Sequence, residues 1–393
     1  MFFLNSIRHV AYKNPWDISV EQRLKMLASG KKRVAYIYEQ ADYSTFRYRA
    51  YNMAQVLNSA TENIVISASY FFLKDLSYLN EIADLADVLV ICRVRYDECI
   101  RQFISEFRSR GKKVLFDVDD LVFNVDWAQT MVSTTDQPSD KGVFDFWCTY
   151  ISTIGETLKQ CEGGITTNAF LAEQVRDFVD IPTAIIPNFL NREQLAISEQ
   201  IFSAKQNFEP AQDGHIHIGY FSGTPSHNKD FALVVPALEI LLEEIPNLRI
   251  VVVGYINADV LIHKFGDRIK YFPFCDFINL QKLIGSVEFN IVPLQDNVFT
   301  NCKSELKYFE AAIVGTQTIA SPIFTYAKAI RHQDNGYLSQ DNQWYNTITQ
   351  AIHQMKDYQK MAARSHVHAQ DHYAWYNQKQ VILNALNSLG CNL

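Results

Sequence analysis

The chain of 393 residues is 48% apolar and 20% charged, a composition that excludes extended disorder and provides for about two globular domains. Its formal net charge of -7 argues against a nucleic-acid partner, because phosphate backbones select a surplus of Lys and Arg. The seven cysteines show no C-x-x-C motif and no pairing rhythm, which favours reduced thiols in a cytoplasm. No run approaches about 18 uninterrupted apolar residues, and the apolar run at the start is too short for a secretory leader, so we expect no membrane span.

Residues 1–32 are predicted to form a basic N-terminal extension. Together with Arg33 they carry seven basic side chains against two acidic ones, so this stretch is +5 and the remainder is -12. Two interpretations stay open for the extension: a solvated arm, or an arm that rests on the anionic cytoplasmic face of an inner membrane. The apolar side chains available for such a membrane contact are Phe2, Phe3, Leu4 and Trp16.

Short apolar runs alternate with amphipathic segments from residue 33 onward, which is typical of β-α-β units and a parallel sheet. The amphipathic segment 96–111 ends on Gly111, as expected of a helix C-terminus. We therefore expect residues 33–190 to form an N-terminal Rossmann-like domain. Its expected strands are 33–39, 63–68, 87–92, 113–118, 163–167 and 183–187.

Residues 191–214 are polar and end in Pro and Gly, which predicts a domain linker. A second alternating series follows over residues 215–365, so the fold class is α/β with two doubly wound domains. Residues 366–393 are expected to form a helix that crosses back to the N-terminal domain. The expected strands of the second series are 215–221, 248–254, 268–272, 287–293 and 316–321.

The loop SGTPSHNKDF, residues 222–231, follows the first strand of the second series. Ligands of an open parallel sheet bind beyond the carboxyl ends of its strands, so this loop is a candidate site. Backbone donors at Gly223 and Thr224, with the Lys229 ammonium, are suited to a pyrophosphate. A single glycine is also common in any turn between a strand and a helix.

The stretch NCKSELKYFEAAIVG, residues 301–315, takes the equivalent place after a later strand. At i,i+4 spacing Lys303 and Lys307 repel each other mildly, which hints at a nearby anion. For Glu310, an ordinary carboxylate on the solvent-exposed face of a helix is the alternative to a contact with a ligand.

Three carboxylates, those of Asp117, Asp119 and Asp120, gather at the carboxyl end of the strand 113–118. They cannot all be desolvated cheaply, so some must face a cleft, a cation or a hydroxyl ligand. A metal is one alternative, although neighbouring aspartates without further ligands rarely form a cage. For Arg47, at the start of a helix, contact with an anionic or sugar ligand and a surface salt bridge are both open.

The motifs G-x-S-x-G, G-x-x-x-x-G-K-[ST] and G-x-G-x-x-G do not occur, and the ten histidines show no metal-binding spacing. This disfavours hydrolase triads, P-loop chemistry and dinucleotide redox chemistry.

The segments IHIGYFSGTPSHNKDF, LRIVVVG and VEFNIVPLQDNVFTNCKSELKYFEAAIVGTQTIAS, with GGITTNAFLAEQV and AIIPN in the first half, resemble a known family. It is the retaining GT-B glycosyltransferases called glycosyl transferases group 1 (family four). FRYRAYNMAQVL with KVLFDVDDLVF is similar to the subgroup that builds bacterial O-antigen and capsule polysaccharides, rhamnosyl transferases included. The resemblance covers about residues 33 to 375, and the Glu-Ala-Ala-x-x-Gly-Thr block is its most specific part.

The resemblance implies two facing Rossmann-like domains, with a nucleoside-diphosphate-sugar donor in the C-terminal one and the acceptor in the N-terminal one. Glu310 would hydrogen-bond the ribose hydroxyls, Lys229 would hold the diphosphate, and Phe274 would lie at the nucleobase. The backbone N–H groups that would meet phosphate and sugar belong to Ser304, Glu305 and Leu306.

Two donor positions depart from the family pattern. Cys302 stands eight residues before Glu310, where many relatives have a glutamate that touches the sugar, so that Lys303 or Glu305 would have to substitute. Thr224 and Pro225 occupy the candidate positions of an arginine that usually accompanies the diphosphate lysine.

The implied reaction is transfer of a hexosyl or deoxyhexosyl group, with retention, to a hydroxyl of a growing bacterial surface polysaccharide or lipid-linked oligosaccharide. It requires no metal or other cofactor. Asp119 or Asp120, with Arg47, would position or deprotonate the acceptor, and His227 would compensate for a histidine that relatives have at the cleft. The alternatives are a catalytically degenerate scaffold subunit that binds sugar or nucleotide, and a GT-B nucleotide-sugar epimerase. Peripheral contact with the inner membrane and the oligomeric state stay open.

Overall fold

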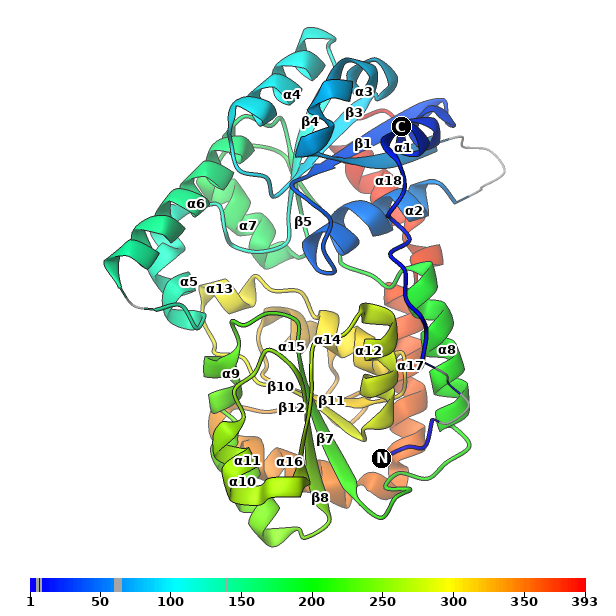
Figure 1. Cartoon of the computed structure of the whole chain (residues 1–393), viewed down its shortest axis with the longest axis vertical. Coiled ribbons are helices and arrows are strands. Elements are labelled where there is room, and N and C mark those ends of the chain that lie inside the picture. The colour runs from blue at the N-terminus through cyan, green and yellow to red at the C-terminus, as the bar shows by residue number, and fades with distance from the viewer. Residues whose placement is uncertain (5–6, 8, 60–65, 139) are drawn as a thin grey trace.

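The computed structural model describes residues 1–4, 7, 9–59, 66–138 and 140–393. Arg8 of the basic segment and residues 63–65 of the expected second strand lie outside these described residues. Two α/β domains lie one above the other along the long axis of the molecule (Figure 1). Each is built on a six-stranded sheet in which the paired strands run parallel.

The N-terminal sheet has the strand order β2-β1-β3-β4-β5-β6. Its strands are β1 (Lys32–Tyr38), β2 (Ile66–Phe72), β3 (Val88–Cys92), β4 (Lys113–Val118), β5 (Gly164–Thr166) and β6 (Thr183–Ile185). Its helices are α1 (Val20–Ala28), α2 (Asn52–Leu57), α3 (Leu79–Leu85), α4 (Glu98–Ser109), α5 (Ala128–Thr134), α6 (Lys141–Lys159) and α7 (Ala169–Phe178). Helices cover both faces of the sheet, which is why its strands are apolar on both sides.

The C-terminal sheet has the order β12-β11-β10-β7-β8-β9. Its strands are β7 (Ile216–Ser222), β8 (Leu248–Gly254), β9 (Ile269–Phe272), β10 (Phe289–Val292), β11 (Gln317–Ala320) and β12 (Tyr337–Leu338). Its helices are α9 (Asn228–Ala232), α10 (Val235–Glu244), α11 (Asp259–Phe265), α12 (Phe277–Ser286), α13 (Val298–Asn301), α14 (Leu306–Ala312), α15 (Phe324–Ala329) and α16 (Trp344–His353). Every predicted strand overlaps an observed one, and the predicted fold class is confirmed.

Three further helices connect the domains: α8 (Arg192–Lys205), α17 (Tyr358–Tyr373) and α18 (Lys379–Ser388). Figure 1 shows α8 and α17 side by side along one edge of the molecule, and α8 packs against α12. The segment expected as a polar linker is thus largely a packed helix, which buries Leu195 and Ile201. α18 packs against α2 and β6, and it places Ile382 and Leu386 in the core of the N-terminal domain.

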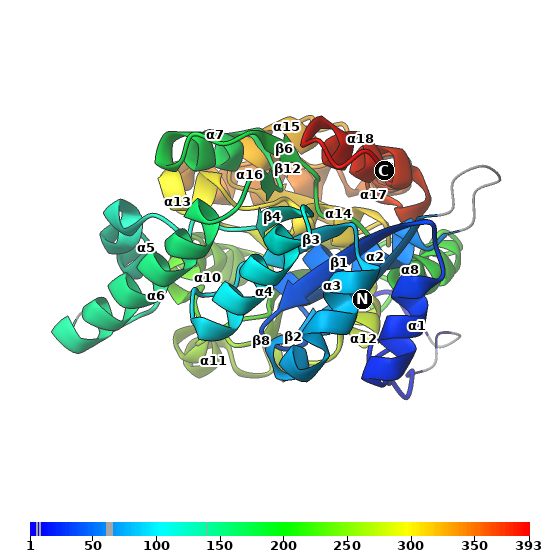
Figure 2. The same cartoon turned by 90° about the horizontal axis from the view of Figure 1, so that it is seen from above.

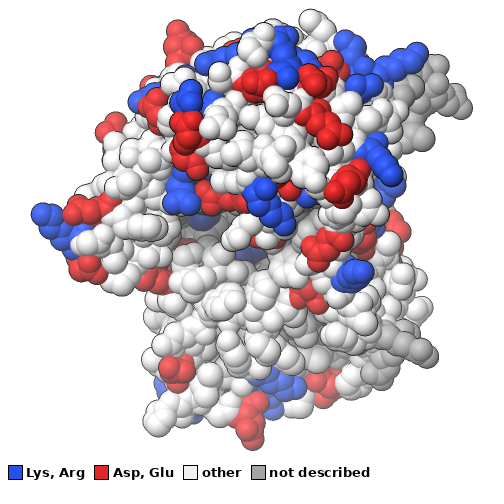
Figure 3. All heavy atoms as spheres, turned by 45° about the horizontal axis from the view of Figure 1, so that its top comes forward, with Lys and Arg blue, Asp and Glu red and all other residues white. Residues whose placement is uncertain are grey.

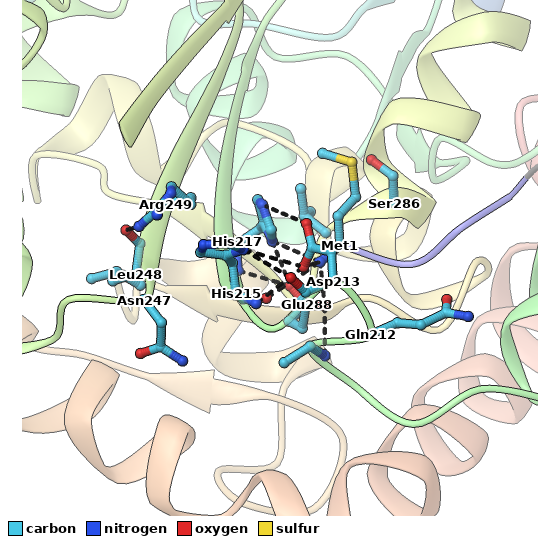
Figure 4. A network of polar contacts seen from close by, with 12 residues as sticks. Met1, Gln212, Asp213, His215, His217, Asn247, Leu248, Arg249, Ser286 and Glu288 are labelled. Carbon is cyan, nitrogen blue, oxygen red and sulfur yellow. Dashed lines mark hydrogen bonds and ion pairs between the residues drawn. The ribbon is translucent and has the colours of Figure 1, made fainter. Parts of the chain in front are cut away.

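The start of the chain packs against the rest of the protein, so the interpretation as a solvated arm is wrong, whereas the contact with a membrane stays a prediction. Phe2, Leu4 and Trp16 are buried in the core of the protein itself, because burial there removes their apolar surface from water. The amino group of Met1 lies 2.6 Å from Asp213 Oδ1, within a network of polar groups at the base of the C-terminal domain (Figure 4). Over the described part of the chain, no helix has the length and apolar character that a bilayer crossing needs.

Candidate functional site

A cavity of about 360 Å³ lies between the domains, since both domains contribute to its lining. From the N-terminal domain come residues 42–44 and 47–48 after β1 and Asp119 after β4. From the C-terminal domain come residues 221–224 at the end of β7, Val253 of β8, and Leu306 and Glu310 of α14. Figure 3 shows a hollow at the junction of the domains, with basic and acidic side chains beside it. The cavity therefore lies beyond the carboxyl ends of both sheets, where the sequence predicts a ligand.

Glycine is required where β7 and β8 end at this cavity. Gly254 has a φ of +91°, and a Cβ at this position would lie 1.9 Å from the carbonyl oxygen of Ser222. Another residue would push the strands apart and move Ser222, which lines the cavity.

Glu310 is a buried carboxylate that faces the N-terminal domain. Its Oε1 accepts hydrogen bonds from the Tyr48 hydroxyl at 2.6 Å and from Gln194 Nε2 at 2.9 Å. Arg47 Nη2 lies 3.3 Å from the same oxygen and pairs its charge. The alternative of a plain surface carboxylate is wrong, because only 5% of Glu310 is exposed and its charge is compensated inside the protein.

Arg47 is held in one orientation and does not swing freely. Its Nη1 donates to Gln194 Oε1 at 3.0 Å, and its guanidinium lies over the rings of Tyr48 and Phe277 at 4.1 and 4.5 Å. It belongs to a π-helical turn, Arg47–Tyr51, which leads into α2. Since Arg47 is in the N-terminal domain and both Glu310 and Phe277 are in the C-terminal one, the pair connects the two walls of the cavity.

Asp119 reaches the cavity from the end of β4, held by two donors. Thr45 Oγ1 donates to Asp119 Oδ2 at 2.8 Å, and Arg93 Nη1 donates to Asp119 Oδ1 at 3.1 Å. Arg93 has a φ of +48°, an uncommon conformation for a residue with a side chain, and such strain is concentrated at functional sites. The neighbouring Asp120 lies 3.9 Å from Arg93 and 3.7 Å from Lys303, so its charge is also balanced by cations.

Asp117, the first of the three aspartates, is structural. Arg49 Nε and Nη2 donate to its two carboxylate oxygens at 2.7 and 2.9 Å, and both side chains are fully buried. Burial raises the pKa of the Asp117 carboxyl, and the Arg49 charge opposes this effect. Within the described ranges, no group of three or more His, Cys, Asp and Glu side chains is arranged to hold a metal ion.

Lys307, whose repulsion with Lys303 hints at a nearby anion, is the member of that pair that lines the cavity. Its Nζ lies 4.8 Å from the centre of the Tyr220 ring, and burial lowers the pKa of its ammonium to about 8. Among the described residues, no carboxylate comes within 4.0 Å of this ammonium. An anionic ligand would provide the missing counter-charge.

Lys229 is not brought to the cavity. It is exposed near the start of α9, where its Nζ donates to the Ser133 carbonyl at 2.8 Å and its backbone N–H to Asp136 Oδ1 at 3.1 Å. These contacts join the 222–231 loop to the end of α5 in the other domain. The short helix α9 turns Lys229 outward, and its direction could not be read from the motif.

His227 precedes α9 and is held by a carboxylate of the same loop. Its Nδ1 lies 3.0 Å from Asp230 Oδ2, and burial together with the nearby Lys307 charge lowers its pKa to about 4. The imidazole is therefore neutral at physiological pH, and it is not among the residues that line the cavity.

The residues just before α14 mostly face away from the cavity. Lys303 pairs with Asp120, and Ser304 Oγ accepts from Asn188 Nδ2 at 3.1 Å. Glu305 Oε1 accepts from the Tyr373 hydroxyl of α17 at 2.8 Å, and burial raises its pKa. Glu305 thus bonds to α17 and does not line the cavity, so it does not replace the sugar-contacting glutamate there.

Cys302, at the position of that glutamate, is fully buried and packs in the core cluster of the N-terminal domain. Its carbonyl accepts from Asn168 Nδ2 at 2.8 Å, so this segment fastens the two domains together.

Phe274, Gly223, Thr224 and Leu306 all line the cavity, as the sequence predicts for donor-binding residues. The Phe274 ring is 39% exposed and stacks between Tyr43 and Tyr255, with ring centroids 6.1 and 5.6 Å away. Phe274 and Tyr43 line the cavity and give it an aromatic face, and Tyr255 stacks on Phe274 without lining the cavity.

Sequence reasoning missed Arg93, Tyr48, Gln194 and the cavity position of Lys307. Tyr48 and Lys307 stand within the predicted motifs, and the charge repulsion between Lys303 and Lys307 was the one signal of a nearby anion. Gln194 lies in the expected linker, where no pattern marks it.

Comparison with known proteins finds that residues 216–357 match the family model described as Glycosyl transferases group 1. No curated protein matches the chain. Among solved structures, Anabaena HepE in complex with UDP and glucose is 11% identical, with a TM-score of 0.58 over 90% of this chain and 99% of that one. Sucrose-phosphate synthase from Thermosynechococcus elongatus is 15% identical, with a TM-score of 0.60 over 92% and 99%. A mutant of TarM from S. aureus is 14% identical, with a TM-score of 0.51 over 76% and 55%. At these identities the likeness concerns the fold: the chain has the GT-B fold, and residues 216–357 match Glycosyl transferases group 1.

Proposed function

We propose that this protein is a retaining glycosyltransferase. It would transfer a hexosyl or deoxyhexosyl group from a nucleoside-diphosphate-sugar to a hydroxyl of a growing bacterial surface polysaccharide or lipid-linked oligosaccharide. The family match of residues 216–357 supports the reaction class, and structures similar to this chain were solved with UDP or UDP-glucose. The proposal needs no metal or other cofactor.

The donor would lie against the C-terminal wall of the cavity. Glu310 offers a fixed, charged acceptor to the ribose hydroxyls, and the aromatic face at Phe274 offers a stacking surface to the base. Lys307 takes the place that the motif assigns to Lys229, because its ammonium lines the cavity without a carboxylate within ion-pair distance among the described residues. As the sugar leaves, this cation and the backbone at Gly223 would stabilise the charge on the diphosphate.

The acceptor would approach from the N-terminal wall. Asp119 already has two oxygens directed by Thr45 and Arg93, so it can receive a hydrogen bond from an acceptor hydroxyl and orient it. Burial between the domains would keep water from competing for the donor. Arg47 holds Glu310, so its proposed role is to position the donor site and not to carry a proton.

The observation that carries the proposal is a single cavity in which Lys307 and Glu310 of the C-terminal domain meet Asp119 of the N-terminal domain. The test is calorimetric titration with UDP, dTDP, GDP and ADP, followed by incubation with the matching sugar nucleotides and lipid-linked or oligosaccharide acceptors. We expect binding of a nucleoside diphosphate and acceptor-dependent release of that diphosphate, detected by mass spectrometry. Absence of binding by all four nucleotides would contradict the proposal.

A scaffold subunit without catalytic activity is the second candidate, favoured by the burial of Cys302 away from the cavity. A scaffold that uses the cavity only to bind a nucleotide would bind the diphosphate but release none from a sugar nucleotide. The two candidates therefore differ in the second step of the experiment and not in the first.

A further inference from the structure

A second cavity, of about 260 Å³, opens at the carboxyl edge of the N-terminal sheet, and none of the proposed donor residues lines it. Its lining comes from the loops after three neighbouring strands, with Glu39 after β1, Leu73 after β2 and Arg95 after β3. The helix α6 forms the opposite side with Phe146 and Tyr150. Figure 1 and Figure 2 show α5 and α6 projecting from one side of this domain.

The α6 side of this cavity is an exposed aromatic surface. The rings of Phe146 and Tyr150 are nearly parallel, at 27°, with centroids 6.2 Å apart, and Phe146 is 57% exposed. Trp147 meets the Tyr150 ring edge-on at 5.3 Å. Phe146 and Tyr150 therefore present adjacent ring surfaces to the cavity, on which the apolar face of a ligand can pack.

Polar groups face the aromatic surface from the sheet edge. Arg95 Nε donates to Glu39 Oε1 at 2.9 Å, and the guanidinium lies 5.4 Å from the centre of the Tyr150 ring. No acceptor among the described residues takes the remaining N–H groups of Arg95, and 49% of its side chain is exposed. The cavity thus combines a flat apolar surface with a donor and an acceptor that fix orientation, as small polar ligands require.

Two of these three loops, those after β1 and β3, also hold residues at the first cavity. After β1, Glu39 lines the second cavity and Asp42 the first, and three residues span at most about 11 Å. After β3, Arg93 holds Asp119 in the first cavity, whereas Arg95 lines the second. A chain molecule bound in the second cavity could therefore extend to the proposed site of transfer.

We propose that the second cavity binds a pyranose ring of the acceptor glycan, at a sugar unit other than the one that is glycosylated. The apolar face of the ring would stack on Tyr150 and Phe146, while Arg95 and Glu39 hydrogen-bond its hydroxyls. The identification of this glycan as the acceptor rests on the proposed function.

The test uses full-length protein labelled with 5-fluorotryptophan, because Trp147 lies next to Tyr150 and reports on the cavity. Its ¹⁹F resonance is assigned with Trp147→Phe, and the protein is titrated with the methyl glycosides of glucose, galactose, mannose, rhamnose and N-acetylglucosamine. We expect at least one sugar to shift this resonance in a saturable manner. Arg95→Gln and Tyr150→Ala should each weaken that sugar about ten-fold or more, the loss expected for one hydrogen bond to a charged group or one stacked ring.

The matched control is Tyr345→Ala, since Tyr345 is also a partly exposed tyrosine on a helix but lies on α16 of the other domain. A resonance that no sugar moves, or an affinity that Arg95→Gln and Tyr150→Ala leave unchanged, would overturn the proposal. Calorimetry with nucleoside diphosphates on the same samples separates this outcome from failure of the proposed function. If a nucleotide binds while Trp147 stays silent, the second-cavity proposal alone fails.

Discussion

The hydrogen bond from Tyr48 to Glu310 gives the sharpest test of how the cavity is held together. Tyr48→Phe removes the hydroxyl alone, so it leaves the packing of the ring in place. Glu310 Oε1 would then keep only Gln194 at 2.9 Å and Arg47 at 3.3 Å. A hydrogen bond to a charged group contributes about 1.5–3 kcal/mol, and with two donors left we expect the lower end, about 1.5 kcal/mol.

The assay is urea unfolding followed by circular dichroism, with Tyr345→Phe as the matched control. The Tyr345 hydroxyl also donates to a carboxylate, Glu244 Oε2 at 2.7 Å, but that pair is exposed. Because water replaces a surface hydrogen bond, the control should lose less than about 0.5 kcal/mol. Equal losses in Tyr48→Phe and Tyr345→Phe would refute the reasoning that Glu310 is a buried carboxylate whose charge depends on these donors.

Three further predictions concern the cores of the domains. Burial lowers the pKa of Lys205 to about 7, below its unfolded value of about 10.4, so the unfolded chain binds more protons than the folded one between these two pH values. The free energy of unfolding measured with urea should therefore rise from pH 7 to pH 9, and Lys205→Met should flatten this rise. Phe2→Ala should lower the free energy of unfolding by about 3–5 kcal/mol because Phe2 is buried, and Phe3→Ala by less than about 0.5 kcal/mol because Phe3 is exposed. Equal small losses would mean that the start of the chain is a solvated arm. Arg49→Ala should lower the free energy of unfolding by about 3–5 kcal/mol because Asp117 is left buried without its partner, and Arg49→Met combined with Asp117→Leu should recover most of this loss. A double variant as unstable as Arg49→Ala would contradict the prediction.

The sheets could be predicted because their signal is local. Runs such as 87–92 and 248–254 are apolar throughout, which is what a parallel strand covered on both faces requires. Gly111 was also correctly predicted to follow a helix end, and it has a φ of +68°. β12 was missed because two residues carry no periodicity.

The N-terminal segment and the helix α8 could not be predicted because their partners are distant in sequence. Phe2 donates its N–H to the Ser286 carbonyl at 2.9 Å, and Lys205 of α8 donates to the Val287 carbonyl at 3.1 Å. Average polarity describes only the exposed side of such segments. The few side chains that pack inward decide where they lie.

For the candidate site, sequence motifs placed residues at the correct edge of each sheet but not their directions. Glu310 and Asp119 reach the cavity, whereas Lys229 turns outward to Ser133. The partner of Glu310 is Arg47, 263 positions away, and only the packing of the domains brings them together.

The claim that Lys307, and not Lys229, meets the donor diphosphate is tested most directly by calorimetry with the nucleoside diphosphate that binds best. Lys307→Met should weaken this ligand about ten-fold or more, because a charge-assisted hydrogen bond to phosphate is lost, while Lys229→Met leaves the affinity unchanged. The reverse result, full affinity in Lys307→Met and loss in Lys229→Met, would contradict the account.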